Sequence, residues 1–308
     1  MKILVTGGAG FIGSNLVLKL VSENNVIVLD NLSEGKKENL KGVMDHIEFV
    51  KGDVRNQSLM ENLVSKVDVV FHLAANASVP NSVVNPRYDF EANVLGTFNL
   101  LKASADSDVK KFVLASSAAV YGDLLEPQAN ENCPTDPVSP YGASKLSAEL
   151  QAISFKKTYG LPVAIARIFN VYGPMLPRYV LYDFYKNLKA NPNKLEVLGD
   201  GEQVRQFCYV TDAIDALLLL EKKGDGVFNV AGNQRTKIKD LAKFVIANVS
   251  PQAKIEYTGK SWSGDIKTLV GDISKLKKLG FEPKIAIDYG VRMTIDWFKK
   301  NEHTLAFT

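Results

Sequence analysis

Residues 3–13 have the sequence ILVTGGAGFIG, and this stretch decides the fold. Its first four residues are apolar or β-branched, which is typical of a buried strand. Gly7, Gly10 and Gly13 follow, and a stretch of helical length then runs to Ser22. Such a strand-to-helix turn needs glycine where the backbone approaches a pyrophosphate or packs against the strand, and the helix start offers free N–H groups to an anion. The stretch therefore predicts a dinucleotide-binding loop.

An acidic residue, Asp30, ends the next predicted strand, 17 residues after Gly13. A carboxylate at this place accepts hydrogen bonds from the adenosine ribose hydroxyls and repels a 2′-phosphate. The residues that follow, Asn31 to Gly35, include no arginine that would neutralise such a phosphate. The sequence thus predicts NAD, rather than NADP, as the cofactor.

The first 170 residues alternate short β-branched segments with stretches of helical length. The expected strands are Ile3–Thr6, Val26–Asp30, Ile47–Lys51, Val67–Leu73, Phe112–Ser116 and Val163–Ile168. The expected helical stretches between them include Gly13–Ser22, Ser58–Lys66 and Tyr88–Ala105. This alternation predicts an α/β protein of the Rossmann type, a doubly wound parallel sheet covered by helices on both faces.

The pattern changes near Tyr172, where prolines begin to interrupt the chain. We therefore expect residues 1–171 to form the NAD-binding domain and residues 172–308 to form mainly a smaller C-terminal α/β domain for the substrate. The segment Gly226–Val230 is expected to be a strand that can return to the first sheet. Residues 288–300 are expected to form a surface helix that closes the chain.

Composition excludes several classes of protein. Lysine and arginine number 37 against 34 acidic residues, so no strongly basic surface points to a nucleic-acid partner. No apolar run approaches the roughly 18 residues of a membrane span. The two cysteines, Cys133 and Cys208, are too far apart to suggest a disulfide framework or a metal site. We expect a cytoplasmic protein with no metal, no nucleic acid and no membrane segment.

Tyr141 and Lys145 lie four residues apart on a predicted helix that Ser139 and Pro140 begin, so their side chains share a face. A phenol with a pKa of about 10 is a poor base at neutral pH. A nearby ammonium and a positively charged nicotinamide both favour the phenolate. The pair therefore predicts a general base that takes a hydroxyl proton while hydride leaves the same carbon. Ser117 ends a strand at the carboxyl edge, where doubly wound sheets bind ligands.

Four motifs, TGGAGFIGS (6–14), GDVRN (52–56), HLAANASV (72–79) and YGASK (141–145), resemble the extended short-chain dehydrogenase/reductase superfamily. Within it, the chain most resembles nucleotide-sugar 4-epimerases of the UDP-glucose 4-epimerase type, over residues 2–283. The resemblance implies NAD, a nucleotide-sugar substrate linked to UDP, and a homodimer formed by two long helices near residues 88–105 and 141–159.

The resemblance also implies the residues of the site. The cofactor would contact Gly7, Gly10, Phe11, Ile12, Gly13, Asp30, Asn31, Ser33, Gly35, Asp53, Val54, Leu73, Ala74, Ala75, Ser116, Tyr141, Lys145 and Phe169. The catalytic residues would be Ser117, Tyr141 and Lys145, and the substrate would contact Ser117, Asn170, Arg178 and Arg205. Trp262 stands where many members of the family carry a second phosphate-binding arginine, and Leu269 stands where some carry a residue that limits the sugar's C2 substituent.

Ala118 and Ala119 distinguish the branches of this superfamily. Dehydratases and decarboxylases of the family carry carboxylates after the catalytic hydroxyl residue, and these alanines supply none. The sequence therefore favours epimerisation at C4 over the alternatives, an NAD-dependent dehydrogenase, decarboxylase or dehydratase acting on a related sugar nucleotide. A non-catalytic dinucleotide sensor is a further alternative, which the Tyr141 and Lys145 pair disfavours.

Overall fold

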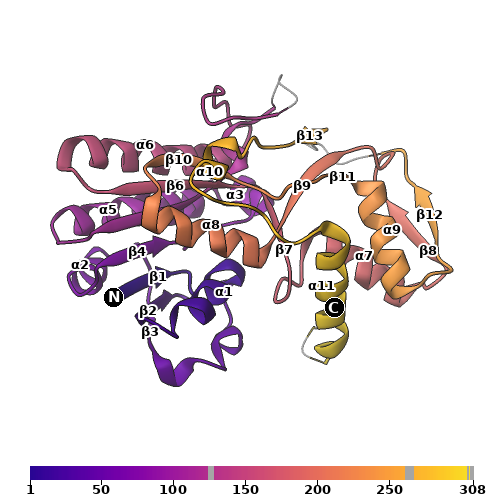
Figure 1. Cartoon of the computed structure of the whole chain (residues 1–308), viewed down its shortest axis with the longest axis horizontal. Coiled ribbons are helices and arrows are strands. Elements are labelled where there is room, and N and C mark those ends of the chain that lie inside the picture. Colours follow the sequence, from indigo (N-terminus) through magenta and orange to yellow (C-terminus); the bar gives the residue numbers. More distant parts are fainter. Residues whose placement is uncertain (124–127, 261–266, 304, 306–308) are drawn as a thin grey trace.

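The computed structural model describes all residues except 124–127, 261–266, 304 and 306–308. The larger of its two parts is built on a central sheet of seven parallel strands that helices cover on both faces (Figure 1). Across the sheet the order is β10-β6-β5-β4-β1-β2-β3. The strands are β1 (Lys2–Thr6), β2 (Asn25–Asp30), β3 (Ile47–Lys51), β4 (Val69–His72), β5 (Lys111–Ser117), β6 (Val163–Ile168) and β10 (Gly226–Val230). The predicted α/β fold with a parallel sheet is confirmed.

Alternate residues of the strands enter two separate cores, as a sheet covered on both faces requires. Ile3 and Val5 pack on the face covered by α1 (Phe11–Leu20) and α8 (Val210–Lys223). Leu4, between them, packs on the opposite face. The helices of that opposite face are α2 (Gln57–Val64), α5 (Gly96–Ala105) and α6 (Pro140–Tyr159).

The predicted helix over Tyr88–Ala105 is present, but the prediction of one regular helix is wrong because a π-helical turn interrupts it. The segments are α3 (Val79–Val84), α4 (Pro86–Phe90), the π-helical η3 (Glu91–Leu95) and α5. In η3 the buried Asn93 bonds to the backbone N–H of Asn76, to Asp89 and to Ser144 of α6. These bonds direct the widened turn toward α6, which a regular 3.6-residue pattern in the sequence does not reveal.

A smaller lobe lies beside the sheet, at the right of Figure 1. Its strands are β7 (Asn170–Tyr172), β9 (Val204–Tyr209), β11 (Arg235–Lys237) and β13 (Thr268–Leu269) in one sheet, and β8 (Lys194–Val197) and β12 (Lys254–Tyr257) in a pair. Its helices are α7 (Tyr179–Ala190), α9 (Ile238–Val249) and α11 (Ile287–Lys300). The remaining short helices are η1 (Lys37–Leu40), η2 (Met44–His46), η4 (Ala118–Val120) and α10 (Ser274–Lys277).

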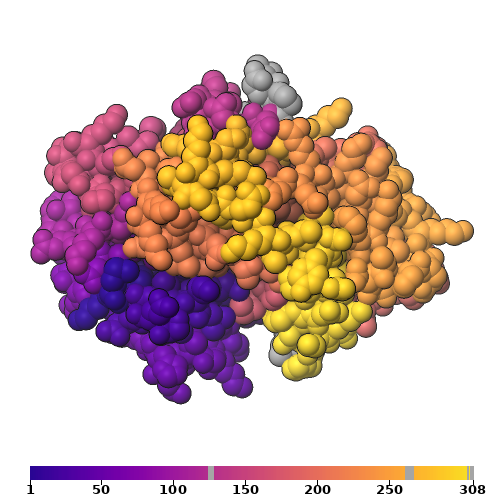
Figure 2. All heavy atoms as spheres, in the orientation of Figure 1, coloured from indigo at the N-terminus to yellow at the C-terminus, as the bar shows by residue number. Residues whose placement is uncertain are grey.

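The chain passes between the two parts more than once. Gly226–Val230 forms β10, which pairs in parallel with β6 of the central sheet, after the chain has already built β8 and β9 of the lobe. The C-terminal residues, yellow in Figure 2, then lie across the junction between the two parts. A division of the chain at residue 171 stays a prediction.

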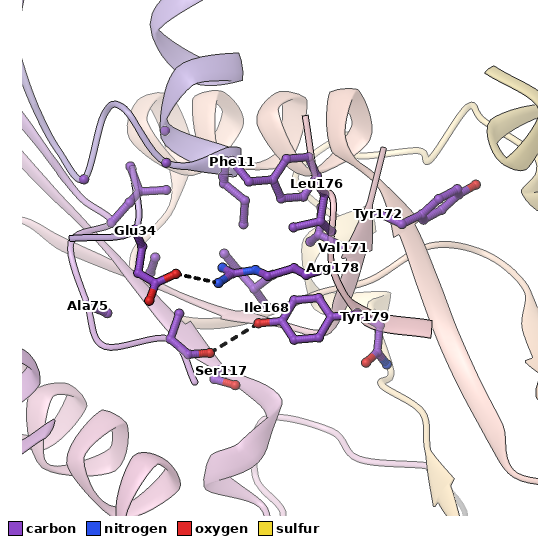
Figure 3. A pocket seen from close by; sticks show the side chains of 18 of the residues that line it. Phe11, Glu34, Ala75, Ser117, Ile168, Val171, Tyr172, Leu176, Arg178 and Tyr179 are labelled. Carbon is purple, nitrogen blue, oxygen red and sulfur yellow. Dashed lines mark hydrogen bonds and ion pairs between the residues drawn. The ribbon is translucent and has the colours of Figure 1, made fainter. Parts of the chain in front are cut away.

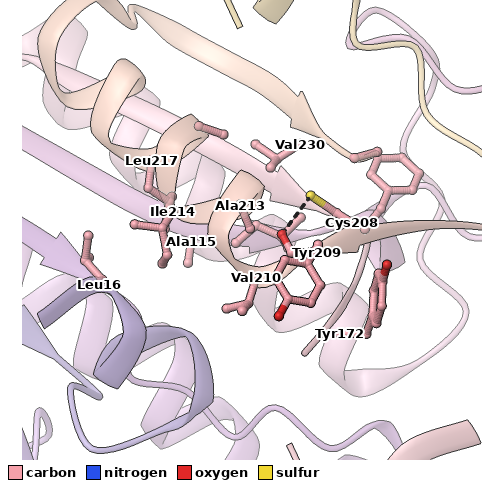
Figure 4. Close-up of a cluster of buried hydrophobic side chains, with 14 of the residues drawn as sticks. Leu16, Ala115, Tyr172, Cys208, Tyr209, Val210, Ala213, Ile214, Leu217 and Val230 are labelled. Atoms are coloured by element: carbon pink, nitrogen blue, oxygen red, sulfur yellow. Dashed lines mark hydrogen bonds between the residues drawn. The ribbon is translucent and has the colours of Figure 1, made fainter. Parts of the chain in front are cut away.

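Helix α8 fixes the lobe to the sheet. Figure 4 shows Ile214 and Leu217 of α8 on the side of Leu16 and Ala115, while Tyr209 and Val210 at the helix start lie on the side of Tyr172. These side chains are almost completely buried and belong to one continuous apolar core. One continuous apolar core therefore holds the sheet and the lobe together. Among the described residues, no helix has the length and apolar character needed to cross a membrane.

Candidate active site

One cleft of about 830 Å³ lies at the carboxyl ends of the central strands, between the sheet and the smaller lobe. Every cofactor, catalytic and substrate residue predicted from the sequence lines it. The structure thus brings together positions that are separated by up to about 200 residues of sequence. The contacts assigned to these residues with cofactor and substrate stay predictions.

The glycine loop forms a cradle that side chains would fill. Gly7 has φ +68°, and a Cβ there would lie 2.7 Å from the backbone N of Ala74. A Cβ on Gly13 would lie only 2.1 Å from the Gly7 carbonyl oxygen. Gly10, the N-cap of α1, supplies no side-chain cap, so the first N–H groups of the helix have no side-chain acceptor there. This arrangement fits a pyrophosphate.

Asp30 is held at the end of β2 by two backbone donors. Its Oδ2 accepts from the N–H of Ala9 at 2.9 Å, and its Oδ1 accepts from the N–H of Leu32 at 2.8 Å. Each carboxylate oxygen can accept further bonds, so ribose hydroxyls have acceptors available. Glu34 adds a second acidic side chain to this side of the cleft, which further disfavours a 2′-phosphate. The residues present therefore fit NAD.

Asp53 lies beside this region in a fixed ion pair. Burial disfavours its charge, but the hydrogen bonds from Arg55, with a further one from Asn31, prevail and lower the pKa of Asp53 to about 2. Two guanidinium nitrogens of Arg55 contact the two carboxylate oxygens, each at 2.9 Å. Asp53 is thus an anion with fixed orientation at the cofactor end of the cleft.

The predicted helix start places the catalytic pair. Ser139 caps α6 by accepting from the N–H of Gly142 at 3.1 Å, and Pro140 occupies the first turn. One turn apart on the same face follow Tyr141 and Lys145, both lining the cleft. The predicted capping of this helix is confirmed.

Burial has the largest influence on the pKa values of Tyr141 and Lys145. Burial raises the pKa of Tyr141 to about 12, although its hydrogen bond with Ser117 opposes the shift. Burial also lowers the pKa of Lys145 to about 8, while Glu149 and Asp89 oppose that shift. Desolvation thus favours the neutral form of both side chains.

The two consecutive serines at the end of β5 have different partners. Ser117 hydrogen-bonds with Tyr141 and also accepts from the N–H of Ala119 at 3.2 Å, which caps the short helix η4. Ser116 donates its hydroxyl to the buried carboxylate of Glu149 instead. Successive side chains of a strand point to opposite faces of the sheet, which explains why Ser116 and Ser117 have different partners.

Phe169 and Asn170 connect β6 to the lobe. The Phe169 ring lies so close to Gly271 that a Cβ there would come within 2.5 Å of it. The side-chain nitrogen of Asn170 is buried and, among the described residues, has no hydrogen-bond partner. Unpaired buried donors are rare in folded proteins, so this donor in a cleft wall indicates a place for a ligand.

Arg178 and Tyr179 cross the mouth of the cleft, as Figure 3 shows. The Arg178 guanidinium lies 3.2 Å from Glu34, and the Tyr179 hydroxyl donates to the Ala77 carbonyl at 3.5 Å. Tyr179 has φ +67°, a left-handed conformation that is uncommon for tyrosine. No sequence motif pointed to Glu34 or Tyr179, because their approach depends on how the lobe docks on the sheet.

The lobe contributes a further group of lining residues that sequence reasoning missed. They are Val180, Leu181, Asp183, Phe184, Asn187, Glu196, Leu198, Gln203, Phe207 and Ile238. Arg205 lies among them and bonds to the Val204 carbonyl at 3.0 Å. Leu269, on β13 beside Arg205 in register, does not line the cleft, and Trp262 lies outside the described residues.

Carboxylates of the cleft lie away from the catalytic strand. Those among the described lining residues are Asp30, Glu34, Asp53, Asp183 and Glu196. The first three belong to the side of the cleft that carries the glycine loop, and the last two to α7 and β8 of the lobe. Directly after Ser117, alanines occupy η4. In the part of the chain that the structure describes, no acid from β5 or η4 therefore lines the cleft beside Tyr141.

A parallel sheet, a glycine cradle and a Ser–Tyr–Lys set on one cleft together define a short-chain dehydrogenase/reductase. Comparison with known proteins specifies the family: the GDP-mannose 4,6 dehydratase model matches residues 4–294, and the chain belongs to this family of extended short-chain dehydrogenases/reductases. The predicted superfamily is confirmed.

Individual relatives cover almost the whole chain. The structure of UDP-glucose 4-epimerase from Thermotoga maritima, with UDP-glucose, has a TM-score of 0.92 and 36% identity over 98% of this chain and 100% of its own. UDP-N-acetylglucosamine 4-epimerase from Methanobrevibacter ruminantium has a TM-score of 0.92 and 35% identity over 97% and 98%. The dTDP-D-glucose 4,6-dehydratase of Mus musculus is 32% identical over 98% of this chain and 90% of its own.

Proposed function

We propose that this protein is an NAD-dependent epimerase that inverts C4 of a nucleotide sugar. The observation that carries the proposal is the set Ser117, Tyr141 and Lys145 beside the glycine cradle, followed by Ala118 and Ala119 in place of acidic residues. Dehydration needs added acid and base groups, whereas epimerisation needs one base and a recyclable hydride carrier. The similar UDP-sugar 4-epimerases agree with this reaction.

When bound, NAD would supply an acceptor for the hydride of the sugar C4 and a hydride donor to the opposite face of the 4-keto sugar. The glycine loop would hold its pyrophosphate and Asp30 its adenosine ribose, and Lys145 and Phe169 would hold its nicotinamide half. The similar UDP-glucose 4-epimerase of Thermus thermophilus was solved in complex with NAD. NAD is the cofactor of this protein.

The chain's own residues perform the proton transfer. Tyr141 takes the proton of the sugar 4-hydroxyl and later returns it to the 4-keto oxygen. Ser117, already bonded to Tyr141, positions that hydroxyl in the same hydrogen-bond chain. The Lys145 ammonium stabilises the phenolate, and this stabilisation is needed because burial alone raises the pKa of Tyr141.

The substrate's diphosphate and nucleoside fit the lobe. The unpaired nitrogen of Asn170 is a ready donor to a phosphate oxygen, and the fork of Arg205 suits two of them. The nucleoside, which we propose to be uridine, would lie among the α7 and β8 residues beyond. Arg178 pairs with Glu34 through one nitrogen, and its guanidinium carries further N–H donors for a diphosphate.

We predict that Arg205→Met raises the KM for a UDP-sugar with little change in NAD content. Hydrogen bonds to charged groups contribute about 1.5–3 kcal/mol, which corresponds to an increase of roughly 10- to 150-fold. The measurement is steady-state kinetics with the cofactor released by denaturation and quantified. An unchanged KM would remove Arg205 from the diphosphate site. The matched control is Arg292→Met, because Arg292 lies on α11 and does not line the cleft.

The proposed function is tested by a panel of UDP-glucose, UDP-galactose, their N-acetyl counterparts and UDP-glucuronate, incubated with purified protein and no added cofactor. We expect C4 epimers as the products and no accumulation of NADH. In a parallel incubation with added NAD, steady NADH formation would instead identify a dehydrogenase. A pentose or a 4-keto-6-deoxy product would identify a decarboxylase or a dehydratase, the activities named for other members of the family.

We also propose a homodimer and a cytoplasmic location. Phe90, Leu95, Phe98 and Leu150 are exposed on α4, η3, α5 and α6, and α5 and α6 are neighbours. A second copy of the same helices would bury this apolar surface. Light scattering during gel filtration should give twice the mass of one chain. Both cysteines are free, which suits a reducing compartment.

A further inference from the structure

A third ionisable residue continues the face of α6 that carries the catalytic pair. Tyr141, Lys145 and Glu149 follow one another at four-residue steps, so their side chains lie in a row along the helix. Glu149 is only 1% exposed and does not line the cleft, which places it behind Lys145. A buried carboxylate in this position needs partners of its own.

Those partners come from the two strands beneath the helix. Arg167 of β6 contacts Glu149 through Nε at 3.0 Å and through Nη2 at 2.7 Å, and Ser116 of β5 donates its hydroxyl to the same carboxylate. Ser116 and Arg167 are register neighbours in the sheet. Arg167 is fixed on its other side by the ring of Tyr121, 4.7 Å away. The carboxylate is thus held in one orientation.

We propose that Glu149, held by Arg167 and Ser116, is a positioning residue that keeps the Lys145 ammonium charged while Tyr141 takes the substrate proton. The inference rests on the proposed function for the role of Tyr141. A buried ammonium tends to lose its proton unless a negative charge lies near it. The charge on Lys145 is what makes the phenolate accessible, so Glu149 acts on the reaction through Lys145.

The other groups around Lys145 leave Glu149 as a main source of negative charge. Asp89 of α4 also opposes the loss of the proton, and its carboxylate bonds to the amides of Asn76 and Asn93. His72 of β4 is neutral, because burial and then the charge of Lys145 lower its pKa to about 3. Tyr141 is neutral until it takes part in the reaction. Burial holds the pKa of Lys145 at about 8 despite both carboxylates, so little margin remains near neutral pH.

Two variants of the buried pair should move the pH profile in opposite directions. Glu149→Gln removes the negative charge but keeps an oxygen for Ser116 and Arg167, so we expect the alkaline limb of kcat to move to lower pH by about one unit or more. Arg167→Gln leaves the charge of Glu149 unneutralised, so we expect that limb to move to higher pH. Loss of packing alone would lower kcat in both variants at every pH without displacing the limb.

A titration of Lys145 in the absence of substrate separates this inference from the proposed function. The protein is labelled with ¹³C at the lysine ε carbons, and the pH titration of these carbons is followed by NMR. The signal that is missing in Lys145→Arg is assigned to Lys145. The same opposite displacements of its titration are expected. An unchanged Lys145 titration in both variants would overturn the inference. If the Lys145 titration moves but the protein epimerises no sugar, the influence of Glu149 on Lys145 stands and the proposed function is refuted. If Glu149→Gln does not fold, the double variant Glu149→Gln/Arg167→Gln replaces it, because it leaves no unpaired buried charge at this pair. The Lys145 titration of the double variant is then compared with that of Arg167→Gln.

Discussion

Tyr141→Phe should lower kcat by roughly 10²- to 10⁴-fold and leave NAD bound. The substitution removes one oxygen, the atom that takes the sugar proton, and leaves the ring in its buried place on α6. Lys145 keeps its position, so the cofactor groove is unchanged. The experiment measures epimerisation of a UDP-sugar by product chromatography and, on the same sample, the NAD released by denaturation.

The matched control for this variant is Tyr159→Phe, which removes a hydroxyl from an exposed tyrosine at the other end of α6. Its turnover should equal that of the unmodified protein. Turnover of Tyr141→Phe within a factor of two of this control would show that another group takes the proton, and the mechanism would fail. If Tyr141→Phe loses both its bound NAD and its turnover, Tyr141 instead helps to hold the cofactor.

The cofactor half of the site was predictable because local sequence determines it. A glycine is needed wherever a Cβ would strike neighbouring backbone of the same loop, as at Gly13, and such positions keep fixed spacing after a strand. The acid at the end of β2 and the Tyr–Lys pair on α6 follow from strand and helix geometry alone. Each of these features belongs to one element or to two elements adjacent in the sequence.

The substrate half was less predictable because distant segments build it. Glu34 meets Arg178 across 144 residues, and only the docking of the lobe on the sheet makes them neighbours. The partner of Ser116 was missed for a related reason, since Glu149 approaches the strand only when α6 packs on β5 and β6. The spacing of Tyr141 and Lys145 also carries no information on their burial, which raises the pKa of Tyr141 and lowers the pKa of Lys145.

Gly13→Ala should weaken NAD binding strongly, because the added methyl group meets backbone rather than a flexible side chain. Its Cβ would lie 2.1 Å from the Gly7 carbonyl oxygen and 2.8 Å from the Gly8 Cα, so the loop and α1 must separate. Overpacking of this kind costs about 1–3 kcal/mol, equivalent to roughly 5- to 150-fold weaker binding if the strain falls on the cofactor-bound form. The measurement is NAD retained through gel filtration, followed by titration calorimetry.

Gly42→Ala is the matched control, since a Cβ at Gly42 has no atom within 4 Å among the described residues. It should keep its NAD and its thermal stability. Excess NAD should restore turnover to Gly13→Ala if the catalytic residues are undisturbed, because Gly13 lies on α1 whereas Tyr141 lies on α6. Full NAD retention by Gly13→Ala would mean that the loop can relax around the methyl group, and the cradle would then not be the element that decides cofactor binding.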